Sequence, residues 1–210
     1  MEFDLKRRMM VERQLRARGI ADERVLAAMA AIPREEFVPE PLRERAYADE
    51  PLSIGFGQTI SQPYMVALMA QCLALDGTET VLEVGAGSGY HAAVLGALAG
   101  RVLALEFIPE LAELARANLE RAGCGTNVTV MSRDGSLGCP EYAPFRAISV
   151  AAGATRVPPA LAVQLAEGGR MVIPIGDDDQ ELWVITKAAG ELRPRVAAYC
   201  RFVPLVGAGT

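Results

Sequence analysis

The sequence predicts an α/β domain built on a doubly wound, mostly parallel β-sheet, and three features of its 210 residues support this. From residue 80 onward, short apolar runs alternate with segments of helical spacing, a pattern typical of parallel strands joined by right-handed crossover helices. The strand-like runs 181–189 and 195–206 have no helix between them, so we expect an antiparallel pair at the C-terminal end. The first 31 residues have helical patterns only, which predicts a helical arm.

The arm is expected to hold two helices. The first covers 4–18 and stops at Gly19. The second runs from about Asp22 to Ala31, because Pro33 cannot continue it.

The segment after the arm is less regular. Residues 33–51 contain four prolines and should be mostly loop with one short helix. They lead to GFGQTISQP (55–63), which by itself predicts a turn and then a helix capped by Ser61 ahead of Pro63.

The core elements follow in alternating order. The expected strands cover 80–84, 101–106, 127–132, 145–152 and 169–176, and the expected helices cover 90–99, 109–123 and 158–169. Pro109 and the acidic residues after it suit a helix start, and paired glycines are expected to end the helix over 158–169. We expect one sheet covered by helices on both faces.

Composition excludes several classes of function. The chain is 51% hydrophobic and 22% charged, as expected for one globular domain, and its net charge of -5 gives no reason to expect nucleic-acid binding. No apolar run of about 18 residues occurs, so we expect a cytoplasmic protein without membrane contact. The four cysteines form no CxxC pair and are expected to be free thiols, with no metal site. His91 is the one histidine, so a Ser-His-Asp triad would depend on that ring.

The glycine-rich turn after the first core strand is the strongest chemical signal. Glu83 precedes Gly85, Gly87, Ser88 and Gly89 at a strand-to-helix junction, where glycines let a ligand approach the backbone and a helix start offers N–H donors. A dinucleotide fingerprint would need glycine at the next position, which is a tyrosine. A tight turn without a ligand is the plain structural alternative.

Two further acidic residues occur at strand ends. Glu106 ends the next strand, where a carboxylate can accept both hydroxyls of a ribose, although a polar strand end alone would explain it. Asp134 and Gly135 follow the third strand and are also compatible with a simple Asp-Gly turn.

Several motifs together resemble one family. They are GQTISQPYMVALM (57–69), VLEVGAGSGYHAAVL (81–95), RDGSLG (133–138), VPPALAVQL (157–165), GGRMVIPIG (168–176) and RFVPLV (201–206). In this order they resemble protein-L-isoaspartate O-methyltransferase, a class I S-adenosylmethionine-dependent methyltransferase, over nearly the whole chain. GQTISQP and RFVPLV are specific to that family, whereas the glycine turn indicates only the superfamily.

The resemblance implies a repair enzyme that methylates the free α-carboxyl of L-isoaspartyl residues in damaged proteins and peptides. Its fold would be one methyltransferase domain, with a helical arm and active-site segment over 1–76 and a cofactor-binding core over 77–210. Ser61 and Thr59 match the catalytic segment. The implied residues for S-adenosylmethionine are Gln58, Glu83, Gly85, Gly87, Ser88, Gly89, Glu106, Phe107, Asp134 and Gly135. We expect a monomer, and the product cofactor would be S-adenosylhomocysteine.

The chain departs from the family pattern near 146–155. Arg146 replaces the usual acid, Ala151 replaces the usual threonine, and Gly153-Ala154-Thr155 follows where the substrate backbone is expected. These departures leave open a methyltransferase of the same fold for another carboxylate, and a noncatalytic binding protein. A nicotinamide oxidoreductase is disfavoured by Tyr90 in the glycine turn.

Overall fold

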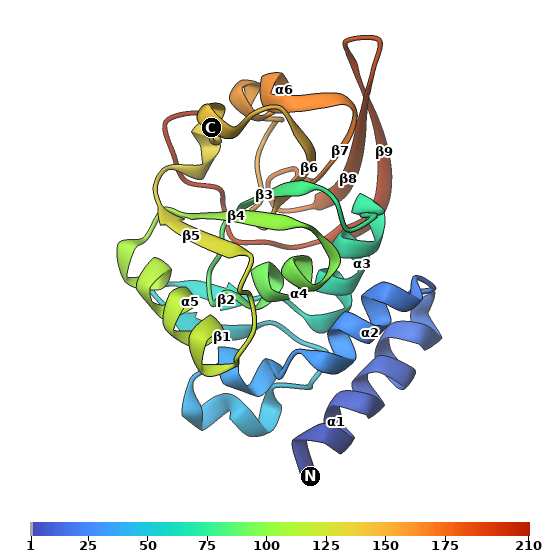
Figure 1. Cartoon of the computed structure of the whole chain (residues 1–210), viewed down its shortest axis with the longest axis vertical. Helices are drawn as coiled ribbons and strands as arrows, with labels where there is room; N and C mark the ends of the chain where they lie inside the picture. Colours follow the sequence, from blue (N-terminus) through green and yellow to red (C-terminus); the bar gives the residue numbers. More distant parts are fainter. Residues whose placement is uncertain (1) are drawn as a thin grey trace.

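A computed structural model describes residues 2–210, whose centre is a seven-stranded sheet with the order β5-β4-β3-β6-β7-β8-β9 (Figure 1). The strands from β5 to β7 are parallel, and β8 and β9 add antiparallel pairs at one edge. Their bounds are β3 Thr80–Val84, β4 Arg101–Glu106, β5 Val128–Ser132, β6 Phe145–Val150, β7 Leu165–Ile175, β8 Gln180–Ala188 and β9 Glu191–Cys200. The predicted fold class is therefore confirmed.

Helices cover the two faces of this sheet unequally. The arm and α3 to α5 lie on one face, and α6 with η5 and η6 covers the other (Figure 1). The α-helices are α1 Glu2–Met10, α2 Glu23–Ala31, α3 Pro63–Leu73, α4 Tyr90–Leu98, α5 Pro109–Arg121 and α6 Pro159–Gln164. The shorter turns are η1 Val11–Leu15, which is a π-helix, and the 3-10 turns η2 Arg16–Arg18, η3 Arg34–Phe37, η4 Glu40–Arg45, η5 Gly135–Leu137 and η6 Pro140–Tyr142.

Local chemistry explains the main helix boundaries. Asp22 caps α2 by accepting the backbone N–H groups of Arg24 and Val25, as its place before the helix predicts. Gly19 ends the arm's first helical stretch with a φ of 92°, which favours glycine. Pro109 opens α5 at a position where the missing N–H costs nothing.

Apolar side chains from both faces of the central strands form the core. Leu82 and Leu103 are fully buried on one side, and Val81 and Val102 are fully buried on the other. Burial on both faces accounts for the nearly continuous apolar sequences of β3 and β4. Packing on both faces thus holds the central strands in place, and these strands support the loops at their carboxyl ends.

Four local expectations were wrong in detail. Segment 33–51 holds two 3-10 turns rather than one short helix, and α6 ends at Gln164 because Leu165 already pairs with Phe145. The paired glycines expected to end α6 lie inside β7, where its register with β6 shifts. β9 begins earlier than expected and ends at Cys200, so 201–206 is not a regular strand.

A further correction concerns the segment GFGQTISQP. Its first part forms a hairpin of β1 Leu52–Gly55 and β2 Gln58–Ile60 instead of a simple turn. The N-cap of α3 is Gln62, which makes no side-chain cap hydrogen bond, so Ser61 is not the cap. Its hydroxyl is therefore not committed to capping α3.

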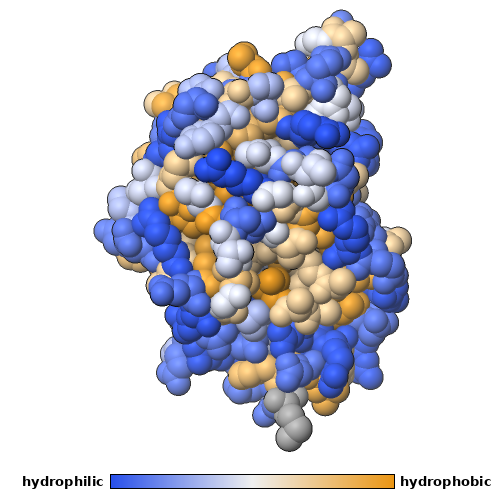
Figure 2. Space-filling model, in the orientation of Figure 1, coloured by the Kyte–Doolittle hydropathy of each residue, from blue (hydrophilic) through white to orange (hydrophobic). Residues whose placement is uncertain are grey.

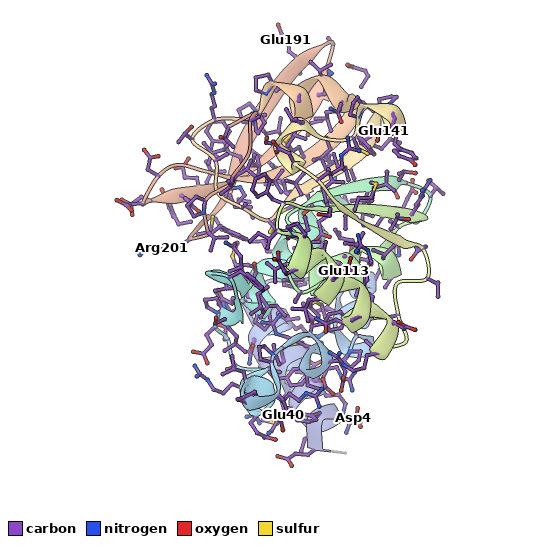
Figure 3. The ribbon with its side chains drawn as sticks, turned by 90° about the vertical axis from the view of Figure 1, so that its left-hand side faces the viewer. Asp4, Glu40, Glu113, Glu141, Glu191 and Arg201 are labelled. Atoms are coloured by element: carbon purple, nitrogen blue, oxygen red, sulfur yellow. The ribbon has the colours of Figure 1, made fainter. Side chains whose placement is uncertain are left out.

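Figure 2 shows how hydropathy is distributed over one face of the molecule. Hydrophilic residues cover most of the rim of the face in Figure 2, with apolar residues gathered near its middle. Within residues 2–210, no helix is long and apolar enough to cross a membrane. Figure 3 shows Asp4 and Glu40 at the arm end of the molecule and Glu191 at the tip of the β8–β9 hairpin, at the opposite end.

Candidate active site

A cleft lies where the carboxyl ends of the central strands meet the β1–β2 hairpin. It has an empty volume of about 610 Å³, part of which is open to solvent. Its walls are Gln58, Thr59, Val84, Gly85, Gly87, Leu105, Glu106, Phe107, Ile108, Gly135, Ala151, Ala152 and the four residues Val203, Pro204, Leu205 and Val206.

The glycine turn between β3 and α4 requires its glycines. Gly85, Gly87 and Gly89 have φ values of 90°, 53° and 87°, a region that side chains disfavour. A Cβ on Gly89 would also come within 3.1 Å of the carbonyl oxygen of Ala115 in α5. Gly89 therefore serves helix packing, whereas Gly85 and Gly87 line the cleft.

The N–H groups of this turn are mostly used within the protein. Gly85 and Ala86 donate to the Leu105 carbonyl, at 2.8 and 3.1 Å, and Gly89 donates to the Ala86 carbonyl at 2.8 Å. Gly87 donates to the Glu106 carboxylate. The glycine turn itself is therefore poorly suited to a phosphate, because the N–H groups of four of its residues already have acceptors.

Glu106 is held rigidly at the mouth of the cleft. One carboxylate oxygen accepts the N–H of Gly87 at 2.8 Å, and the other accepts the N–H of Ile108 at 3.0 Å. The residue is only 6% exposed, and it lines the cleft. Each oxygen keeps a further acceptor position, so the carboxylate can receive two neighbouring hydroxyl groups.

Glu83 lies in a different environment, below the glycine turn. It is fully buried, and neither carboxylate oxygen has a hydrogen-bond partner among residues 2–210. The ring of His91 lies close by, with its Nδ1 atom 3.5 Å from one of these oxygens. Ser149 is its cross-strand neighbour, and the Ser149 hydroxyl is also unpaired within the described chain.

Burial controls the protonation of this pair. Burial, and then the negative charge of Glu106, raise the pKa of Glu83 well above its usual 4.5. Burial also lowers the pKa of His91 to about 4, so the ring is neutral at physiological pH. A cationic ligand group placed beside Glu83 would favour the charged form of this carboxyl group and lower its pKa again.

Asp134 is already engaged by the protein. Its carboxylate accepts the backbone N–H and hydroxyl of Ser136, and also the backbone N–H of Ala208. The adjoining Gly135 lines the cleft, and a Cβ there would lie 2.6 Å from a methyl group of Val84. Gly135 therefore allows η5 to pack closely on β3 and β4, and Asp134 lies just outside the lining.

A second cavity, with an empty volume of about 320 Å³, adjoins the hairpin and the glycine turn. Thr59, Gly85 and Gly87 line both cavities, which places the two side by side. Ser61 lies half-buried in the second cavity. The remaining residues of its lining are Ile60, Val66, Ala86, Ser88, Tyr90, His91 and Ala151.

Most of the predicted residues come together here. Gln58, Thr59, Ser61, Gly85, Gly87, Ser88, Glu106, Phe107 and Gly135 line one or both cavities. Glu83, Gly89 and Asp134 do not line them and lie just behind. Sequence reasoning did not assign the wall formed by 203–206, although RFVPLV was a visible motif, nor His91, whose place beside Glu83 depends on helical spacing.

The departures near 146–155 divide into two groups. Arg146 is exposed at the amino end of β6 and lies 3.8 Å from Asp76, away from the cleft. Ala151 lines both cavities, and Gly153 exchanges backbone hydrogen bonds with Val203 and Leu205. Only the second group can affect what the site binds.

The residues fit a nucleoside cofactor that carries positive charge. The orphaned carboxylate oxygens of Glu83 suit a cationic group, Glu106 suits ribose hydroxyls, and Gly135 borders the cleft beside them. No cluster of three or more metal-ligating side chains occurs within the part of the chain that is described.

Comparison with known proteins agrees with this geometry. Residues 6–210 match the family described as Protein-L-isoaspartate(D-aspartate) O-methyltransferase. A protein-L-isoaspartate O-methyltransferase from Koribacter versatilis is 55% identical over 206 residues, which are 98% of this chain and 92% of the relative.

Solved structures give the same result. A protein-L-isoaspartate O-methyltransferase superposes with a TM-score of 0.86 at 32% identity, over 97% of this chain and 67% of the other. A Plasmodium falciparum protein of that description, in complex with S-adenosyl-L-homocysteine, superposes with a TM-score of 0.79 at 29% identity, over 95% of this chain and 98% of the other.

Proposed function

The chain belongs to the protein-L-isoaspartate(D-aspartate) O-methyltransferase family, and from that premise we propose which of its residues hold S-adenosylmethionine and orient the substrate. It is a protein repair enzyme that methylates the free α-carboxyl of isoaspartyl residues. One observation carries the residue assignment. The glycine turn, the fixed Glu106 carboxylate and the Ser61 segment lie together around the cleft and the smaller cavity beside it.

Glu106 binds the ribose in this proposal, and the backbone around Gly135 receives the adenine. Asp134 accepts the adenine amino group from behind Gly135, and Phe107, which is 50% exposed beside the cleft, covers one face of the ring. Glu83 faces the methionine end and balances its α-ammonium charge. The bound cofactor supplies the electrophilic methyl group.

The chemistry needs orientation more than proton transfer. An α-carboxyl group has a pKa of about 3.5, so the nucleophile is already ionised at neutral pH and needs no general base. The neutral ring of His91 is consistent with this, because its pKa of about 4 leaves it a weak base. The protein's task is to bring the carboxylate to within roughly 3–3.5 Å of the methyl carbon, in line with the bond that breaks.

Ser61 and Thr59 supply that orientation. Both hydroxyls border the smaller cavity, beside the glycine turn, and Ser61 is free of the capping role that its sequence position suggested. A hydroxyl can donate a hydrogen bond to a carboxylate without taking away its charge. The methyl ester that forms has a better leaving group than the free carboxylate. The next backbone nitrogen can therefore attack the ester carbonyl carbon and release methanol, which closes a succinimide, and hydrolysis of that ring can return a normal aspartyl linkage.

The remaining assignments concern the chain as a whole. We assign residues 1–76 to an arm and active-site segment and 77–210 to a cofactor-binding core, within one domain that acts as a monomer. We place the enzyme in the cytoplasm, which fits its four free cysteines because thiols persist in reducing compartments. Sedimentation analysis of the purified protein tests the monomer.

The test of the reaction is methyl transfer from labelled S-adenosylmethionine to two peptides that differ only in an isoaspartyl or aspartyl linkage. We expect transfer to the isoaspartyl peptide alone. Equal transfer to both peptides, or to neither, would contradict the proposal.

The test of Ser61 is Ser61→Ala, with Ser53→Ala as its control, because Ser53 is exposed on the same hairpin and lines neither cavity. Ser61→Ala should lower kcat by about 100-fold, the usual effect of removing an orienting donor, and leave cofactor affinity unchanged. Unchanged turnover would remove Ser61 from the mechanism.

A further inference from the structure

Residues 207–210 follow the cleft wall and turn back onto η5. Phe202 to Leu205 are anchored first, since Gly153 donates to the Val203 carbonyl at 2.8 Å and accepts from the Leu205 N–H at 2.7 Å. Ala208 then donates its N–H to Oδ2 of Asp134 at 2.7 Å, and Gly209 donates to Oγ of Ser136 at 2.9 Å. In Figure 1 the C mark accordingly lies on the gold segment after β5.

These contacts use most of the acceptor capacity of Asp134. A carboxylate has about four acceptor positions. Oδ1 accepts the N–H of Ser136 at 2.9 Å and its hydroxyl at 2.5 Å, and Oδ2 accepts the N–H of Ala208. One position therefore remains, on Oδ2. These hydrogen bonds outweigh burial and hold the pKa of Asp134 below its usual value, so the carboxylate stays charged.

The packing also explains why the segment contains glycine. A Cβ on Gly207 would lie 2.1 Å from Oδ1 of Asp134 and 2.3 Å from Oγ of Ser136. A Cβ on Gly209 would lie 2.8 Å from the backbone oxygen of Ser136. Any side chain at Gly207 must push the Asp134 carboxylate out of its present orientation, because the carboxylate is the movable partner.

We propose that residues 207–209 are positioning residues for the cofactor's adenine ring. They hold the Asp134 carboxylate so that one acceptor position remains, and that position takes one N–H of the exocyclic amino group. The inference rests on the proposed function, because it assumes that the cleft binds S-adenosylmethionine. It adds that the selectivity for adenine depends on a segment distant from Asp134 in the sequence. Ala208 and Asp134, which the hydrogen bond joins, are 74 positions apart.

The test compares two ligands by calorimetry, S-adenosylhomocysteine and S-inosylhomocysteine, in which an oxygen replaces the amino group and the N–H donor is lost. The wild type should prefer the adenosyl compound by about 10- to 100-fold, as expected for one hydrogen bond to a charged group. Gly207→Ala should reduce this preference to below about 3-fold. With the isoaspartyl peptide it should raise KM for S-adenosylmethionine and leave kcat unchanged.

Two further variants make the result decisive. Removal of 207–210 frees Asp134 without a steric clash and should also abolish the preference, which separates positioning from misfolding. Gly190→Ala is the control, since its Cβ would meet nothing within 4 Å and it adjoins Glu191 at the far hairpin tip (Figure 3).

The outcomes test the positioning role of residues 207–209 separately from the cofactor site itself. If Gly207→Ala and the truncated chain keep the wild-type preference, or bind S-adenosylhomocysteine more tightly, the positioning role is wrong while the cofactor site stands. If the wild type binds neither ligand, the proposed cofactor site itself is wrong.

Discussion

Replacing Glu83 with glutamine is expected to stabilise the free enzyme and to weaken its cofactor complex. Glu83 is fully buried, and its oxygens have no hydrogen-bond partner within residues 2–210. Burial raises its pKa well above 4.5, so the folded protein keeps a proton that the unfolded chain has lost. The stability that this proton contributes is complete below pH 4.5 and is lost as the pH rises through the folded pKa.

Glutamine has nearly the same shape but does not titrate. The stability of Glu83→Gln relative to wild type should therefore grow by up to about 1.4 kcal/mol per pH unit above the usual glutamate pKa. For a domain of this size each kcal/mol corresponds to about 2 to 4 °C in Tm. The binding of S-adenosylhomocysteine should weaken by about 10-fold or more, because glutamine, unlike Glu83, cannot give up a proton to become a charged partner of the α-ammonium group.

Urea unfolding of both proteins at about pH 5, 6 and 7, with calorimetric titration of the ligand, measures both effects. His91 is present in both proteins, so its titration cancels from the difference. Glu79→Gln is the control with the opposite sign, because that carboxylate accepts N–H groups of Asp76 and Gly77 at 2.9 to 3.1 Å. If Glu83→Gln were less stable than wild type at neutral pH, the description of Glu83 as unpaired would be refuted.

Three further predictions follow from the same geometry. Glu106→Gln should raise the Kd for S-adenosylhomocysteine by about 10- to 100-fold in calorimetry, and an unchanged Kd would exclude Glu106 as the ribose ligand. Gly89→Ala should lower the free energy of unfolding in urea by about 2 kcal/mol or more, because its Cβ would lie 3.1 Å from the Ala115 oxygen. Gly123→Ala is its control: the added Cβ meets nothing within 4 Å, and the substitution should cost about 1 kcal/mol. Equal losses in the two variants would contradict the packing role of Gly89. Burial lowers the pKa of His91 from 6.5 to about 4, so between these values the unfolded chain binds more protons and the free energy of unfolding falls as the pH falls. His91→Gln should reduce this loss of stability towards acid pH. Parallel plots of the free energy of unfolding against pH for the two proteins would show that His91 is not desolvated.

Sequence reasoning succeeded where local pattern decides structure. The strands over 80–84 and 101–106 and the helix from Pro109 were predicted within a residue or two, because apolar period and end residues determine them. Gly85, Gly87 and Glu106, which the sequence singles out as glycines and an acidic strand end, lie together in the lining of the cleft.

It failed where distant contacts decide. The β1–β2 hairpin has strands of only 4 and 3 residues, too short for a clear alternation, and α6 ends where β7 pairs with β6. The bond between Ala208 and Asp134 joins parts of the chain that no local pattern relates. The unpaired state of Glu83 likewise depends on which N–H groups its neighbours have already used.

That distribution of N–H groups also determines what the glycine turn can offer to a ligand. In a phosphate-binding turn, free N–H donors point at the anion. Here the donors of Gly85, Ala86 and Gly89 go to carbonyl oxygens, and that of Gly87 goes to Glu106. The turn thus fixes one carboxylate by donating to it and leaves the other, Glu83, without donors. Two acidic groups, whose mutual repulsion adds to the raised pKa of Glu83, disfavour a pyrophosphate and favour a ligand with an ammonium or sulfonium group. The tyrosine in place of the third dinucleotide glycine and the hydrogen bonds within the turn therefore both disfavour a dinucleotide at this site.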